Sequence, residues 1–82
     1  MAEAPIIDLD VRELSSHEHH MTIFARFDTL NPGDILRLIN NHHPRLLQYQ
    51  FIVERPGLFE WEPEQQGPEI WVIRIRKTAT ET

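Results

Sequence analysis

The segment ILRLINNHHPRLLQYQFIVERPG, residues 35–57, decides the fold. Its first five residues are apolar except for Arg37 and have strand length, which indicates a strand inside a sheet. Pro44 suits the first position of a helix, where its missing amide hydrogen would have had no partner. Apolar residues then recur at helical spacing until Pro56 and Gly57 end the helix. The segment therefore predicts a strand, a short turn and a helix in succession.

The residues before this segment predict a strand and a longer helix. Apolar residues interleaved with Asp8 and Asp10 indicate a short strand that starts at residue 6. Ser15 followed three residues later by Glu18 forms a capping box, so a helix begins near Ser16. The helix has about fourteen residues and ends before a proline in the sequence NPG. Its apolar stripe comprises Ile23, Phe24, Phe27 and Leu30.

The residues after the segment predict a hairpin. Residues 58–62 and 70–77 both alternate between apolar and polar side chains, which indicates two strands joined by a long tip. On their polar face, two glutamates fall across from two arginines and allow cross-strand charge pairing. The charged residues concerned are Glu60, Glu62, Arg74 and Arg76.

The predicted element order is β-α-β-α-β-β. This order is typical of a two-layer α/β (α+β) sandwich, in which a four-stranded mixed sheet carries both helices on one face. At 82 residues the chain is one domain, because two separate cores would each be too small to stabilise themselves. We expect residues 6–77 to form the ordered core of the domain, which spans residues 1–82, with short flexible ends.

The composition excludes several classes of function. The chain has no cysteine, so disulfides, thiolate metal sites and thiol nucleophiles are excluded. The net charge of -5 and the scattered positive residues argue against a nucleic-acid partner. No apolar run resembles a signal peptide or a membrane span, which predicts a cytoplasmic protein without a membrane partner. No Ser-His-Asp order or glycine-rich phosphate loop is present, which argues against a conventional hydrolase or nucleotide enzyme.

Polar residues gather at one edge of the predicted sheet. The first two strands end at this edge and both helices begin there. Two helix N-termini and one arginine offer positive partial charge and free amide donors, which suit a carboxylate, phosphate or sulfate. All five histidines also fall there: His17, His19, His20, His42 and His43. The predicted site for a small anion, or for a partner's acidic tail, comprises Arg12, His20, Asn40, His42 and His43.

The same histidines allow a second interpretation. Neutral imidazole binds zinc, copper, nickel and iron, so a transition metal is an alternative ligand of this edge. The candidate metal ligands are His20, His42 and His43, with His17 as a further one. Their spacing matches no strong motif such as HExxH.

Plainer alternatives stay open beside these two. The histidines could lie at the margin of the core or face water, and Arg12 could simply pair with Asp10. In an enzyme, His20 would act as a general base on a small substrate. In a protein-interaction module, the chain would pair through an edge strand or through an open sheet face with Ile35 and Ile39 partly exposed.

Several motifs resemble a known family of sulfur carriers. The sequences LDVREL (9–14), L-x-P-G (30–33) and IRK (75–77) resemble the TusA/SirA-like fold. Those carriers place a Cys-Pro dipeptide at the start of the first helix, where this chain has Ser15-Ser16-His17. Because serine cannot carry a persulfide, the resemblance does not extend to sulfur relay.

The chain is identified more closely as a member of a bacterial family, domain of unknown function 2249. The matching motifs are LDVREL (9–14), H-x-x-I-F-x-x-F-D-x-L (20–30), N-x-H-x-P (40–44), Y-Q-F (49–51), ERPG (54–57) and GPEIW-x-x-R-I-R-K (67–77). The resemblance implies conserved types at Arg12, His20 and His42. It also implies acidic residues at positions 41 and 43 and a proline at position 46, where this chain departs from the pattern.

The family resemblance also shapes the expected role. Members occur alone, in tandem or fused to hemerythrin-like domains, which suggests a hemerythrin-like or redox protein as a partner. The family has no established activity to carry over. We therefore expect an accessory or binding domain more than an enzyme, with no cofactor other than the transition metal of the second interpretation.

Overall fold

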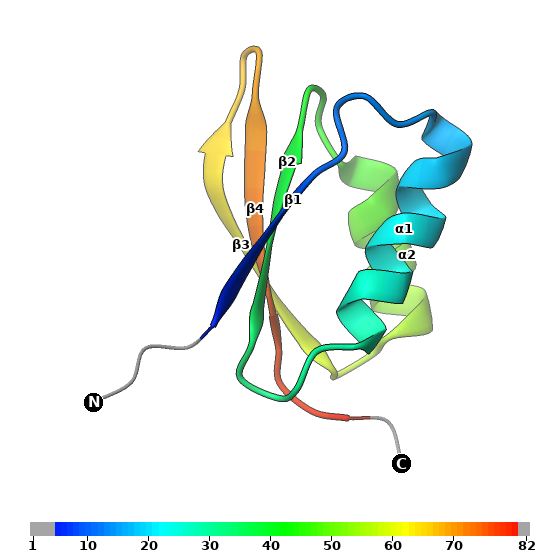
Figure 1. Cartoon of the computed structure of the whole chain (residues 1–82), viewed down its shortest axis with the longest axis vertical. Helices are drawn as coiled ribbons and strands as arrows, with labels where there is room; N and C mark the ends of the chain where they lie inside the picture. Colours follow the sequence, from blue (N-terminus) through cyan, green and yellow to red (C-terminus); the bar gives the residue numbers. More distant parts are fainter. Residues whose placement is uncertain (1–4, 81–82) are drawn as a thin grey trace.

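The computed structural model describes residues 5–80, apart from the side chains at positions 16 and 17. Its elements are β1 (Ile6–Asp10), α1 (Ser16–Asp28), β2 (Ile35–Asn40), α2 (Arg45–Glu54), β3 (Phe59–Gln66) and β4 (Trp71–Lys77). The sheet order is β1-β2-β4-β3, with β1 parallel to β2 and the other two pairs antiparallel. Both helices cover the same face of the sheet (Figure 1). The predicted element order and the two-layer sandwich are therefore confirmed.

The core lies between the helices and the sheet, with Phe51 of α2 at its centre. The Phe51 side chain is fully buried, and its ring lies 4.5 Å from the ring of Phe24 and 5.1 Å from that of Phe27, centroid to centroid. From the sheet side, the ring of Phe59 lies 5.1 Å away. These aromatic contacts connect α1, α2 and β3, so they hold the two helices side by side on the sheet.

Local sequence signals position both ends of α1. The predicted capping box is present: the Ser15 side chain accepts a hydrogen bond from the Glu18 amide, and the Glu18 side chain accepts one from the Ser15 amide. At the other end, the buried ammonium of Lys77 donates to the carbonyls of Phe27 and Asp28 at 3.3 and 3.2 Å. The capping box fixes where α1 begins, and this helix start forms one wall of the site described below.

The open face of the sheet is covered by ion pairs. The predicted register is confirmed, since Glu60 pairs with Arg76 and Glu62 with Arg74 across β3 and β4. Arg37 of β2 also binds Glu64 with an N to O distance of 2.6 Å.

These long side chains change the exposure of the residues beneath them. Ile35 lies among the charged residues of β3 and β4 and is only 3% exposed, so the prediction of partial exposure is wrong for Ile35. The stems of long charged side chains shield apolar surface in this way. For Ile39 the prediction is confirmed, because its side chain is partly buried.

The hairpin differs from its prediction. We expected a long tip after residue 62, but β3 continues to Gln66, and only residues 67–70 lie between β3 and β4. The register shifts between Pro63 and Gln65, where a bulge interrupts the pairing. The alternating pattern stops at Pro63, yet the strand does not, because an edge strand tolerates a proline whose missing amide faces solvent.

No helix among residues 5–80 is long and apolar enough to cross a membrane.

Candidate ligand pocket between the helix starts

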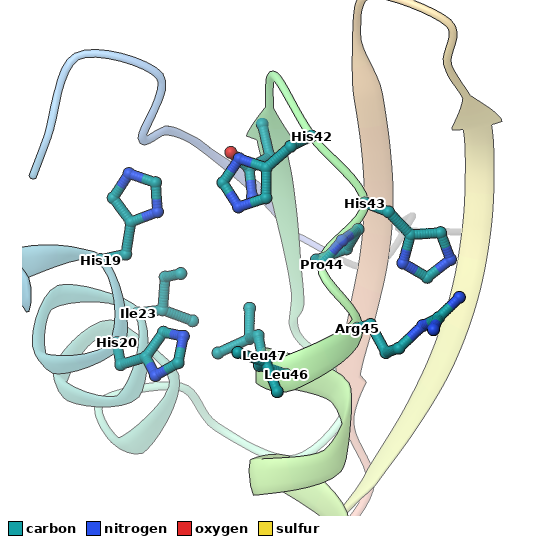
Figure 2. Close-up of a pocket in the computed structure, with 10 residues that line it drawn as sticks. His19, His20, Ile23, His42, His43, Pro44, Arg45, Leu46 and Leu47 are labelled. Carbon is teal, nitrogen blue, oxygen red and sulfur yellow. The ribbon is translucent and has the colours of Figure 1, made fainter. Parts of the chain in front are cut away.

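A pocket of about 210 Å³ lies between the first turns of α1 and α2. The parallel pairing of β1 with β2 places both helix starts at one edge of the sheet, as the sequence predicts. Figure 2 shows the side chains around this pocket. The lining residues are His19, His20, Ile23, Asn40, His42, His43, Pro44, Arg45, Leu46 and Leu47.

Two imidazole rings face each other across the pocket. His19 comes from the first turn of α1, and His42 comes from the turn between β2 and α2. Their ring centroids are 5.9 Å apart and their planes are 10° apart, as can be followed in Figure 2. The ring of His20 lies lower in the same view, toward Leu46 and Leu47. The structure therefore brings four of the predicted site residues to the pocket, namely His20, Asn40, His42 and His43. It adds His19, which the sequence places at the same edge but not in the predicted site.

The proton of His42 is positioned by its neighbour. Nδ1 of His42 lies 3.0 Å from Oδ1 of Asn41. An amide oxygen only accepts hydrogen bonds, so this contact places a proton on Nδ1 of His42. Nε2 is then the ring nitrogen of His42 that remains for a ligand, and it donates to an anion only when it also carries a proton.

His19 forms a buried wall of the pocket. Its side chain is only 7% exposed, and its Nε2 is buried with no hydrogen-bond partner within residues 5–80. An unsatisfied buried polar atom costs about 1–3 kcal/mol. Native proteins carry few such atoms, and an ordered water, an ion, local strain or a catalytic function accounts for them. The His19 residue lines the pocket, but its Nε2 has almost no accessible surface.

The start of α2 is unusually open. Pro44 is the N-cap residue and forms no side-chain cap, and the first turn has no acidic residue. The amide of Gln48 makes the bond to the Pro44 carbonyl at 3.0 Å, so the amides of residues 45–47 have no acceptor inside the helix. These amides belong to residues that line the pocket. They give it positive partial charge and free donors.

Arg45 adds a full positive charge at the same end of α2. Figure 2 shows its side chain extending away from His19 and His20, toward His43 and β3. Arg45 therefore contributes to the electrostatic potential at the rim more than to the inside of the pocket.

Arg12 is not brought into the histidine pocket. Its guanidinium binds the Asp10 carboxylate, with an N to O distance of 2.6 Å, and lines a separate cavity with Asp10 and Glu13. The hydrogen bond from Arg12 lowers the pKa of Asp10 to about 2, so the pair stays ionised at neutral pH. The ion pair between Arg12 and Asp10, which the sequence offers as a plainer alternative, is present.

Two of the predicted residues that line the pocket also contact neighbouring residues. The ring of His43 packs on Trp71, with centroids 4.7 Å apart, on the side of β4. Asn40 is 2% exposed, and its side-chain oxygen accepts a hydrogen bond from the Asn41 amide at 2.9 Å, which fixes the turn before α2. The side chain of His17 lies outside the described residues.

The structure gives the metal hypothesis no support. Within residues 5–80, no group of three or more histidines, aspartates and glutamates is placed to hold a metal ion. His20, His42 and His43 thus do not converge on one ion in this arrangement. The metal hypothesis stays an untested prediction.

Sequence reasoning missed the role of His19. The predicted site included His20 but not His19, whereas His19 is buried. The available signal was the spacing of His19, Ile23 and Phe27, four residues apart each time, which places His19 on the buried face of α1. The uncapped start of α2 was the second signal, because no Ser, Thr, Asp or Asn directly precedes Pro44.

Comparison with known proteins places the chain in one family. No curated protein and no solved structure matches it. Residues 8–77, which include every helix and nearly every strand residue, match the family described as Uncharacterized conserved protein (DUF2249). The chain therefore belongs to this family of uncharacterized conserved proteins.

Proposed function

We propose that this protein is a small binding domain whose histidine pocket holds a small anion. One observation carries the proposal: the uncapped first turn of α2 opens into a pocket lined by His19, His20 and His42. Free helix amides bind anions well, because they offer several donors and the positive end of the helix dipole. The absence of an acidic residue in that turn leaves these donors to a ligand from outside the chain.

The pocket favours a small ligand with some apolar surface. Its volume of about 210 Å³ is well above the roughly 10–15 Å³ that a single water molecule needs. Ile23, Leu46 and Leu47 supply apolar lining beside the imidazoles. A short carboxylate suits both features, since its charged end would meet the α2 amides and its carbon atoms would meet the leucines.

The charge of the whole protein limits the affinity. A net charge of -5 repels anions at long range, so binding depends on donors inside the pocket. Competition by salt is expected, because the pocket is open to solvent and its charges are partly screened.

The test is an NMR titration with three probes: acetate, phosphate and sulfate, each at constant ionic strength. We expect saturating shifts of the backbone amides of residues 45–47 and of the His42 ring, with one dissociation constant for all of these signals. The replacement His42→Ala should raise the dissociation constant several-fold for the probe that binds most tightly. Absence of saturation with all three probes would contradict the proposal.

The matched control is Arg12→Gln. This variant removes a positive charge at the same edge of the sheet, but from a residue that pairs with Asp10 outside the pocket. We expect its dissociation constant to equal that of the unmodified protein. If Arg12→Gln weakens binding as much as His42→Ala, the site lies at Arg12 and the assignment to the histidine pocket is wrong.

A further inference from the structure

A second cavity, of about 320 Å³, lies between the start of α2 and the hairpin of β3 and β4. The hairpin extends past the first turn of α2 toward its own tip (Figure 1). Two indole rings line the cavity, those of Trp61 on β3 and Trp71 on β4. Both residues are only partly buried, although tryptophan is highly buried on average. We call this cavity the tryptophan cleft.

Contacts with the protein hold both indoles in position. The Trp61 ring lies 6.0 Å from the ring of Phe51, centroid to centroid, so the core supports it. The Trp71 ring lies 4.7 Å from the His43 ring. On Gly67, a Cβ would lie only 2.9 Å from the Trp71 side chain, so the indole packs directly on the glycine backbone. Walls that are already in position bind a ligand at a smaller cost in entropy.

Two glutamine side chains add polar groups to the tryptophan cleft. Gln48 of α2 and Gln66 of β3 both line it. Within residues 5–80, neither side-chain amide forms a hydrogen bond with the protein. Each amide can donate and accept hydrogen bonds. Aromatic walls with a few polar groups are the usual composition of a small-molecule site.

Arg45 places a positive charge beside the tryptophan cleft. Its side chain extends toward His43 and β3, which both contribute to the lining (Figure 2). No ion pair or side-chain hydrogen bond engages its guanidinium in the described part of the chain. No acidic residue among residues 5–80 lines the cleft, so nothing in its wall neutralises this charge. A guanidinium offers parallel N–H donors that match the two oxygens of a carboxylate.

We infer that the tryptophan cleft binds a small aromatic carboxylate, with the ring against Trp61 and Trp71 and the carboxylate on Arg45. Aromatic rings attract each other in offset-stacked and edge-to-face arrangements. The cleft volume of about 320 Å³ lies at the small end of the range for ligand sites, roughly 300–1,000 Å³. The cleft shares His43 and Pro44 with the histidine pocket, but its indoles lie outside that pocket. The inference therefore adds a second site to the proposed function.

The first test is an NMR titration with benzoate that follows the indole Nε1–H signals of Trp61 and Trp71 at constant ionic strength. We expect saturating shifts of both signals with one dissociation constant. Two matched ligands separate the parts of the inference. Benzamide keeps the ring without the charge, and cyclohexanecarboxylate keeps the charge without a flat ring. Each should bind several-fold more weakly than benzoate.

The second test removes the proposed contacts one at a time. Arg45→Gln should raise the benzoate dissociation constant several-fold, and the exposed position makes loss of folding no concern. The matched control is Arg26→Gln, which removes an exposed arginine of α1 that lines neither cavity and should leave the constant unchanged. Trp61→Leu should abolish the benzoate shift of the Trp71 indole signal, and urea unfolding checks that this variant is folded.

Two results would overturn the inference: no saturating shift of either indole signal with benzoate, or benzoate binding that Arg45→Gln leaves unchanged. The two proposals also fail separately. If benzoate shifts only the His42 ring and the amides of residues 45–47, the inference is wrong and the proposed function stands. If benzoate shifts the indoles but acetate, phosphate and sulfate give no saturation, the inference stands and the proposed function is wrong.

Discussion

The imidazole rings of His19 and His42 stack against each other with 5.9 Å between their centroids. The two residues are far apart in the sequence. His19 belongs to the first turn of α1, whereas His42 lies in the turn that leads into α2. The contact exists only when both helix starts are packed on the same sheet edge. Any ligand that bridges these rings therefore depends on the tertiary structure of the whole domain.

Replacing His19→Leu should leave the free energy of unfolding unchanged or raise it by about 1 kcal/mol. Leucine fills a similar volume and removes the buried, unpaired Nε2, whose burial is costly. Urea unfolding at neutral pH measures this change. Anion binding should weaken in the same variant, because the pocket loses one of the imidazole rings that line it. A loss of stability of about 2 kcal/mol or more would show that Nε2 has a partner in the folded protein.

Replacing Asp28→Asn should lower the stability by about 0.5–1 kcal/mol at pH 7, the range for an exposed ion pair with good geometry. Arg55 donates two hydrogen bonds to the Asp28 carboxylate, at 2.9 and 2.7 Å, and joins the ends of α1 and α2. Urea unfolding of Asp28→Asn, Arg55→Gln and the double variant measures the coupling between the two residues.

The contribution of Asp28 to the free energy of unfolding should decrease as the pH falls. The hydrogen bond from Arg55 lowers the pKa of Asp28 below its ordinary value of 3.8. A carboxyl with a lowered pKa stabilises the fold above the unfolded value and loses that contribution as the pH falls through the folded value. The difference between the unmodified chain and Asp28→Asn should therefore be constant from pH 7 to about pH 5 and shrink below pH 3.8. A difference that grows with acidity would contradict this assignment.

Replacing Lys77→Met should destabilise the protein by about 1.5–3 kcal/mol, the range for hydrogen bonds to a charged group. The buried ammonium holds two carbonyls at the end of α1 and lies 5.3 Å from the centre of the Phe27 ring. The matched control is Arg76→Met on the neighbouring position, whose side chain is about half exposed. For the control, thermal and urea unfolding should show a change in the free energy of unfolding of about 0.5 kcal/mol or less.

Replacing Gly67→Ala should destabilise the protein more than Gly57→Ala. The two glycines have nearly the same φ, 76° and 75°, so alanine meets the same backbone strain at both positions. At Gly67 a Cβ would also lie 2.9 Å from the Trp71 side chain, whereas at Gly57 it would meet nothing within 4 Å. The difference between the two unfolding free energies isolates the clash with Trp71. Equal losses would show that Trp71 moves away without cost.

Much of the architecture could be predicted from local patterns. The capping box of Ser15 and Glu18 and the strand of residues 35–39 depend on neighbouring residues only, and both are confirmed. The pairing of Glu60 with Arg76 followed from the alternation of the two strands, because every second side chain faces the same side of the sheet. The long hairpin tip was wrong, because Pro63 interrupts the pattern of the sequence without interrupting an edge strand.

The candidate site was only partly predictable. Its location at the edge where both helices begin followed from the element order, because parallel strands end together. The choice of side chains did not follow. Arg12 pairs with Asp10, two residues away, and this local contact removes it from the histidine pocket. Family resemblance singled out residue types at Arg12, His20 and His42, but it did not indicate that His19 is buried beside them.

The sequence by itself determined the element order, the helix ends, the absence of thiol chemistry and the gathering of histidines at one edge of the sheet. These properties depend on composition, on spacing and on contacts between near neighbours. Only the tertiary structure decided that His19 is buried without a partner for Nε2, and that Leu46, Tyr49, Ile52 and Val53 are left uncovered. Burial depends on which elements pack against each other, because a side chain loses its contact with water only when distant parts of the chain cover it.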